Sequence, residues 1–120
     1  MGTTKRIEPD RIAAYFDQFT KRFLADSATD RVDIEVQEPE LGNQFAEEGA
    51  RLLGITYDRG SNALEIALET GDHRTYAPKE VWAVEEPDGF VSAVEVVRAD
   101  GVREIVNVRR GAQRQDETTP

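Results

Sequence analysis

Short alternations of apolar and polar residues occupy much of the chain after residue 31, and turn residues separate them. A period of two is typical of strands that bury one face. Proline at position 78 interrupts one of these runs, so we expect that strand to lie at a sheet edge or to bend. The pattern predicts five or six antiparallel strands, in the runs 32–36, 53–57, 64–68, 73–86, 94–96 and 106–108.

A different period precedes the strands. Apolar residues recur at helical spacing at Ile12, Tyr15, Phe16, Phe19 and Phe23. Four aromatic rings therefore share one stripe, which predicts an amphipathic helix that begins near Pro9 and docks on the sheet. A core role explains such a stripe better than a cofactor site does.

One helix followed by short antiparallel strands is typical of the α+β class. We expect a single domain over residues 8–110, with a disordered N-terminus at 1–7 and a disordered tail at 111–120. The segment from Pro39 to Gly49 is interpreted as a connecting loop. The helix should pack on a strongly bent sheet, which is either open or curled into a small barrel of the Sm or SH3 kind.

Composition restricts the partners. The formal net charge is −9, which makes broad binding of nucleic-acid backbones unlikely to be the main role and calls for a local basic patch instead. The chain has no cysteine, so disulfides and thiolate metal sites are excluded. It shows no apolar signal segment and no membrane-length apolar run, which predicts a cytoplasmic protein without a membrane partner.

Catalytic chemistry has few candidates. His73 is the single histidine and falls in a predicted turn, where an exposed or capping role is typical. Asp33 and Glu35 share one face of a strand and, with Glu47 or Glu48 nearby, would offer oxygen ligands to a divalent cation. Alternating acids are also usual on a solvated sheet face. We therefore expect no cofactor and no metal, and a carboxylate- or metal-dependent enzyme is kept only as an alternative.

Two surfaces are candidates for recognition. Tyr76, Lys79 and Trp82 combine aromatic and basic side chains near the predicted edge strand, which suits contacts with a peptide or a single nucleic-acid strand; a protein partner or a second copy of the chain is the expected occupant. The other surface would bind nucleic acid through a small barrel, using the arginines of the C-terminal hairpin, Arg98, Arg103, Arg109 and Arg110.

Several segments together resemble a small bacterial family known only as a domain of unknown function. The resemblance covers about residues 10–110 and follows turn and strand signatures rather than catalytic ones. It is carried by Leu41-Gly42-Asn43-Gln44, the run from Leu53 to Asp58, the run from Leu64 to Leu68, Asp72-His73, Pro78-Lys79-Glu80-Val81 and the run from Val94 to Val106. The resemblance implies a shared fold and implies no activity. We expect a non-catalytic binding or regulatory module rather than an enzyme.

Overall fold

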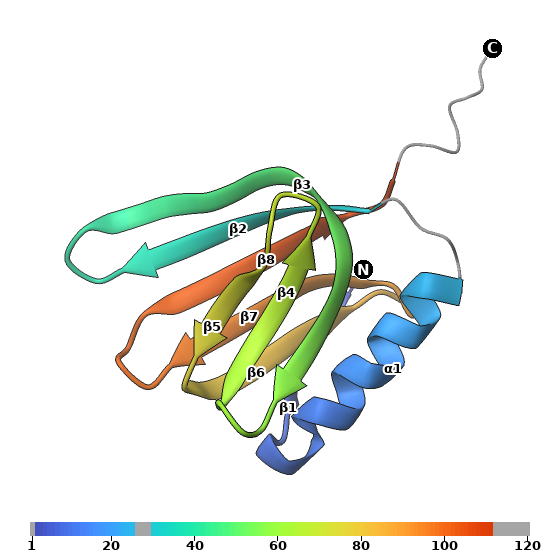
Figure 1. The fold of residues 1–120 in the computed structure, drawn as a ribbon, viewed down its shortest axis with the longest axis horizontal. Helices are drawn as coiled ribbons and strands as arrows, with labels where there is room; N and C mark the ends of the chain where they lie inside the picture. The colour runs from blue at the N-terminus through green and yellow to red at the C-terminus, as the bar shows by residue number, and fades with distance from the viewer. Residues whose placement is uncertain (1, 26–29, 112–120) are drawn as a thin grey trace.

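A computed structural model describes residues 2–25 and 30–111 of the chain. The sequence forms one α-helix preceded by a 3-10 turn, together with eight strands (Figure 1). In chain order they are β1 (Thr3–Ile7), η1 (Pro9–Arg11), α1 (Ile12–Ala25), β2 (Arg31–Glu38), β3 (Gly42–Asp58), β4 (Ala63–Leu68), β5 (His73–Tyr76), β6 (Pro78–Glu85), β7 (Val91–Arg98) and β8 (Arg103–Arg109).

The strands form one sheet in the order β1-β6-β7-β8-β2-β3-β4-β5, and every neighbouring pair is antiparallel. The α+β class and the bent antiparallel sheet are confirmed. The expected strand count of five or six is wrong, because the sheet has eight strands. The sheet is also open rather than closed into a barrel, since β1 and β5 are its two ends.

One extra strand comes from the segment that was expected to be disordered. Residues Thr3–Ile7 form β1, which pairs with β6 through the register Ile7 to Val81. Only Ile7 is buried, so the strand carries no apolar alternation that the sequence could reveal. Backbone pairing to a neighbour, rather than side-chain burial, places it in the sheet. Of the predicted tail at 111–120, residues 112–120 lie outside the described residues.

The other extra strand comes from the run 73–86, which is divided into β5 and β6. Ala77 separates them with a φ of 51°, a left-handed conformation that is uncommon for a residue with a side chain. The amide of Ala77 donates to the carbonyl of Asn62, and its carbonyl accepts from the amide of Ala99. These two bonds stabilise the corner, so the predicted bend at Pro78 is present one residue earlier.

Strand β3 is 17 residues long and includes most of the segment interpreted as a loop. Its first part pairs with β2 and its last part, from Leu52, pairs with β4. Gly49 has a φ of 71°, which only glycine adopts without strain, and it lies at the register shift of the β2 pairing, between Glu47 and Ala50. The β2–β3 hairpin consequently extends away from the body of the protein (Figure 1).

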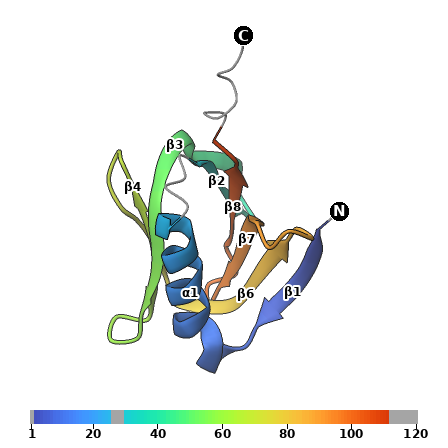
Figure 2. The ribbon, with the colours of Figure 1, turned by 90° about the vertical axis from the view of Figure 1, so that its right-hand side faces the viewer.

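Helix α1 lies within the concave side of the curved sheet (Figure 2). Ile12, Phe16 and Phe19 are buried against the apolar residues of the strands, and Tyr15 packs at the margin of this core. The side chain of Phe23, the last member of the predicted stripe, lies outside the described residues. Thr20 joins helix and sheet directly, since its hydroxyl donates to the carbonyl of Ile55 at 2.7 Å and accepts from the Ile55 amide at 3.0 Å.

Two phenylalanines test this description of the core. Phe16 is fully buried, whereas Phe45 on the extended hairpin is 55% exposed. Replacement Phe16→Ala should lower the free energy of unfolding by about 3–5 kcal/mol, because it removes buried area and leaves a cavity. Replacement Phe45→Ala should change it by less than about 0.5 kcal/mol. Chemical denaturation measures both, and equal losses would contradict the placement of α1.

Candidate functional site

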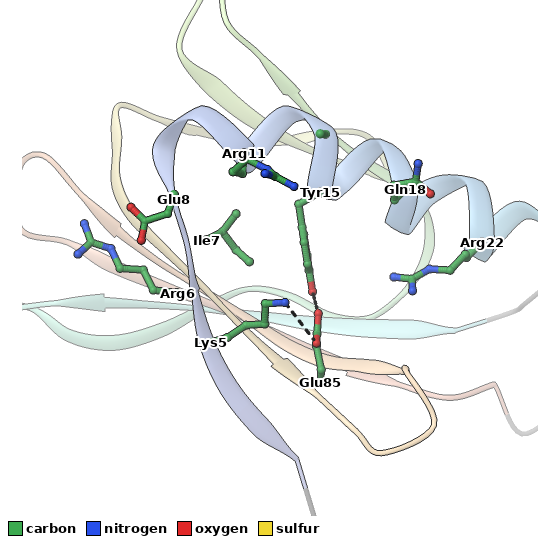
Figure 3. A pocket seen from close by; sticks show the side chains of 10 residues that line it. Lys5, Arg6, Ile7, Glu8, Arg11, Tyr15, Gln18, Arg22 and Glu85 are labelled. Carbon is green, nitrogen blue, oxygen red and sulfur yellow. Dashed lines mark hydrogen bonds and ion pairs between the residues drawn. The ribbon is translucent and has the colours of Figure 1, made fainter.

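A groove of about 450 Å³ separates helix α1 from the edge strand β1 (Figure 3). Its residues come from β1 and the residue that follows it, from one side of the helical segment between Arg11 and Arg22, and from the end of β6. They are Lys5, Arg6, Ile7, Glu8, Arg11, Ala14, Tyr15, Gln18, Arg22 and Glu85. The concave side of the sheet is thus filled by α1 near β3 and is left accessible near β1.

Helical periodicity places the groove residues of α1 beside its buried stripe. Arg11, Tyr15, Gln18 and Arg22 recur at intervals of four, three and four residues, so they share one face of the helical segment. The core residues of α1 follow the same spacing one position later. The packing of the buried stripe therefore fixes the direction in which the groove residues point.

A charged hydrogen bond spans the groove from α1 to β6. The Tyr15 hydroxyl donates to Glu85 Oε2 at 2.5 Å, and Lys5 Nζ lies 3.7 Å from Glu85 Oε1 (Figure 3). Lys5 also lies over the Tyr15 ring, 5.8 Å from its centre. Burial raises the pKa of Tyr15, and the carboxylate of Glu85 raises it further, so the phenol stays protonated and continues to donate.

The groove carries positive charge in an acidic protein. Four basic and two acidic side chains line it, which gives a formal charge of two positive against −9 for the chain. Lys5 is paired with Glu85. Within residues 2–25 and 30–111, no carboxylate lies within ion-pair distance of Arg6, Arg11 or Arg22. These three guanidinium groups are exposed and available to an anion.

The arginines of the C-terminal hairpin are in the opposite situation. Arg98 contacts Glu104 and Asp100, Arg103 pairs with Glu95, Arg109 with Asp33, and Arg110 with Asp88. Arg110 also stacks over the Phe90 ring at 4.0 Å. Because each of these charges already has a carboxylate partner, the geometry does not favour the hairpin as a phosphate-binding surface.

The predicted interaction residues lie along the segment that contains β5 and β6. Tyr76 ends β5 and is 56% exposed, and Lys79 near the start of β6 is also exposed. Trp82 alternates with the buried Val81 and Ala83, so it faces away from α1, and its indole nitrogen donates to Glu80 at 3.1 Å. None of the three lines the groove, and their role as an interaction surface stays a prediction.

His73 has a carboxylate partner, Glu104, that is only 2% exposed. Glu104 accepts hydrogen bonds from His73 Nε2 at 2.7 Å, from the Thr75 hydroxyl at 2.7 Å and from Arg98 at 3.0 Å. Burial alone would raise the pKa of Glu104, but these three partners outweigh it and hold the pKa below its ordinary value. The cluster joins β5 to β7 and β8, and its satisfied carboxylate is a structural anchor.

The carboxylates considered as metal ligands include Asp33, which already has two hydrogen-bond donors. Asp33 accepts from the Gly49 amide at 2.7 Å and from Arg109 at 3.1 Å, and the Arg109 hydrogen bond is the main reason that its pKa is lowered. Glu35 pairs in register with Ile105 and Phe45. In the described part of the chain, no group of three or more histidine, aspartate or glutamate side chains is placed to hold a metal.

Sequence reasoning missed the groove for identifiable reasons. Lys5 and Arg6 belong to a segment that resembles a disordered terminus, and Glu85 is far from them in sequence. The available signal was the second helical stripe, Arg11, Tyr15, Gln18 and Arg22, whose two arginines border the aromatic stripe. When a helix carries a basic stripe next to its buried face, basic side chains lie along the edge of the surface where the helix packs on the sheet.

The fold and groove define a small α+β domain in which one helix is held by an open, curved antiparallel sheet. The chain belongs to a family of unknown function, DUF5335, whose model matches residues 3–117. It is 38% identical over 107 residues to an uncharacterized protein of the bacterium Aquifex aeolicus (strain VF5), covering 88% of this chain and 92% of that protein. No solved structure matches. Among the described residues, no helix is long and apolar enough to span a membrane.

The lowered pKa of Glu104 makes the stability of the protein depend on pH. This pKa is lower in the folded than in the unfolded chain, so the unfolded chain binds the proton more readily and acid favours unfolding. The stabilisation is present above the ordinary glutamate pKa of about 4.3 and is lost as the pH falls through the lower folded pKa. Glu104→Gln should therefore flatten the acid branch of the stability profile.

The same substitution should lower the free energy of unfolding at neutral pH by roughly 1–3 kcal/mol, because buried donors lose a charged acceptor. Denaturant melts at a series of pH values measure both effects. Glu48→Gln, at an exposed position, is the matched control and should leave the profile unchanged. An acid branch for Glu104→Gln as steep as that of the unsubstituted protein would contradict the assignment.

Proposed function

We propose that this protein is a non-catalytic interaction module that binds an extended, acidic segment of a partner protein along β1, at the groove beside α1. The observation that carries the proposal is the set of three exposed arginines, Arg6, Arg11 and Arg22, without carboxylate partners in the described part of an acidic chain. Arg31, Arg74 and the four arginines of the C-terminal hairpin each pair with a carboxylate, so a cluster of three arginines without such a partner at one groove favours recognition of an external anion.

The backbone of β1 supports an extended ligand. β1 is the first strand of the sheet and pairs with β6 on one side, so its other edge is unpaired among the described strands. An added strand there would gain main-chain hydrogen bonds, and alternate side chains would face the groove. Affinity would come from the backbone and selectivity from the charges on both sides.

The spacing of the cations favours a segment of chain over a small anion. Arg11 and Arg22 are eleven residues apart, which is about 16 Å along a helix. An extended peptide covers that distance with about five residues. A small carboxylate or phosphate would reach only one of these groups at a time, whereas a segment with alternate acids would reach both.

The floor of the groove adds an apolar surface. Ile7 from β1 and Ala14 and Tyr15 from α1 lie among the lining residues, and Glu85 is already neutralised by its contacts with Tyr15 and Lys5. A ligand that alternates acidic with apolar side chains therefore suits this groove better than a uniformly acidic one.

A labelled peptide of alternating glutamate and valine tests the proposal. Fluorescence anisotropy should show binding that weakens with added salt, since exposed charge pairs are screened. The triple variant Arg6→Glu, Arg11→Glu, Arg22→Glu should weaken it by about 10–100-fold, corresponding to three pairs of roughly 0.5–1 kcal/mol each. The same peptide with lysine in place of glutamate should not bind the unsubstituted protein.

The control variant is Lys21→Glu, Arg59→Glu, which changes exposed bases outside the groove and should leave affinity unchanged. Thermal unfolding of both variants checks that they are folded. Equal weakening by the control would contradict the assignment to the groove. Full displacement of the peptide by free glutamate or inorganic phosphate at equal concentration would contradict the peptide-binding proposal and indicate a site for small anions.

A further inference from the structure

The most acidic part of the chain is also the part that extends furthest from its body. We call the β2–β3 hairpin from Asp33 to Glu48 the acidic arm. It holds six acids and no base, and Figure 1 shows it projecting at the end of the molecule opposite to α1. At its end Leu41 is 71% exposed, and Phe45 is exposed as well.

One edge of this arm is unpaired. The residues of β3 from Gly42 to Gly49 precede Leu52, the first residue that pairs with β4, so they have β2 on one side only among the described strands. Most of their side chains are exposed, including those of Phe45 and Glu48. A free strand edge with exposed apolar side chains is a template for pairing with another strand.

We propose that the acidic arm of one copy of this chain is the segment that occupies the basic groove of a second copy, with its free β3 edge added to β1. The proposal rests on the proposed function of the groove and names its partner. Its basis is charge complementarity: the arm carries Glu47 and Glu48, which have no ion-pair partner among the described residues, on a strand edge, and the groove carries three unpaired arginines beside the other free strand edge.

The side-chain pattern of the arm matches the ligand that the groove favours. Strand residues alternate in direction, so Phe45 faces opposite to Gln44 and Ala46. Phe45 would meet the apolar floor near Ile7 and Ala14, and one of the two adjacent glutamates, 47 or 48, would reach the arginines, since neighbouring strand residues point in opposite directions. The stretch from Asn43 to Glu48 extends over about 20 Å, comparable to the separation of Arg11 and Arg22 on the helix.

The positions of arm and groove allow the contact to be made twice. The arm lies at one end of the long axis, and helix α1, which borders the groove, lies toward the other (Figure 1). Two chains side by side in opposite directions would each insert an arm into the other's groove, which is a closed twofold arrangement. Closure produces a dimer rather than a filament.

Sedimentation velocity of the full chain tests the inference. The unsubstituted protein should sediment as a dimer at about 50 mM salt and dissociate near 500 mM, where screening shortens the range of charge interactions. Both the groove variant Arg11→Glu, Arg22→Glu and the arm variant Glu47→Lys, Glu48→Lys should be monomeric at low salt. Asp17→Lys, an exposed reversal on α1 outside both surfaces, should remain dimeric.

Mixing the two monomeric variants is the decisive measurement. The reversed groove is acidic and the reversed arm basic, so each contact in the mixed pair is complementary again and a one-to-one dimer should form. Phe45→Ala should weaken the unsubstituted dimer at least about tenfold without changing thermal stability. Two monomeric variants that stay monomeric when mixed would overturn the inference.

The outcome also separates this inference from the function on which it rests. A chain that is monomeric at about 100 µM, where weak contacts are populated, but still binds the glutamate–valine peptide would overturn self-association and retain the groove as a peptide site. If the chain neither self-associates nor binds the peptide, the groove is not a binding site for acidic segments. A dimer unaffected by either pair of reversals would place the interface elsewhere and overturn the proposal.

Discussion

Helix α1 buries Phe16 and Phe19 in the concave side of the sheet, and the orientation of the helix follows from that contact. A strongly bent, open sheet has an apolar concavity that its own strands cannot fill. The helix covers it, and the Thr20 hydroxyl holds the helix against β3 through the backbone of Ile55. Because interiors are close-packed, this arrangement fixes the rotation of the helix about its own axis.

That rotation determines where the polar chemistry lies. The stripe next to the buried one is directed into the space beside β1, which becomes a groove with basic walls. The buried Glu104 of β8 is held by three donors from β5 and β7 and connects the β5 end of the sheet to its centre. Negative charge on the surface is concentrated instead on the extended hairpin, so the molecule has a basic region and an acidic region at its two ends.

The parts of the fold that bury an apolar face could be predicted from sequence. The apolar stripe of α1 and the two strands on either side of Asp100 and Gly101 could both be predicted from the pattern of apolar residues. In that hairpin Val94 pairs with Val106, and Val96 pairs with Glu104. Elements that are held mainly by backbone pairing could not be predicted in this way. β1 buries Ile7 alone, and the first part of β3 buries nothing before Ala50, so neither carries a period-two signal.

The groove was hidden for a related reason. Its walls come from segments that are adjacent only because β1 lies beside β6, and no local pattern encodes that neighbourhood. His73 and Asp33 are residue types common in catalytic and metal sites, but in the structure both form hydrogen bonds within the sheet. The arginines of the groove are ordinary by type and become notable only because their neighbours leave them unpaired.

The order of the strands has a consequence for synthesis on the ribosome. The β2–β3 hairpin joins residues that are close in the chain, so it can form soon after they emerge. In contrast, β1 cannot pair until β6 has been synthesised, and β2 cannot complete its pairing until β8 has been synthesised. Closing such long loops is slow compared with local pairing. A nascent chain therefore displays its acidic hairpin well before β6 has emerged to hold β1 at the edge of the sheet, where the groove is completed.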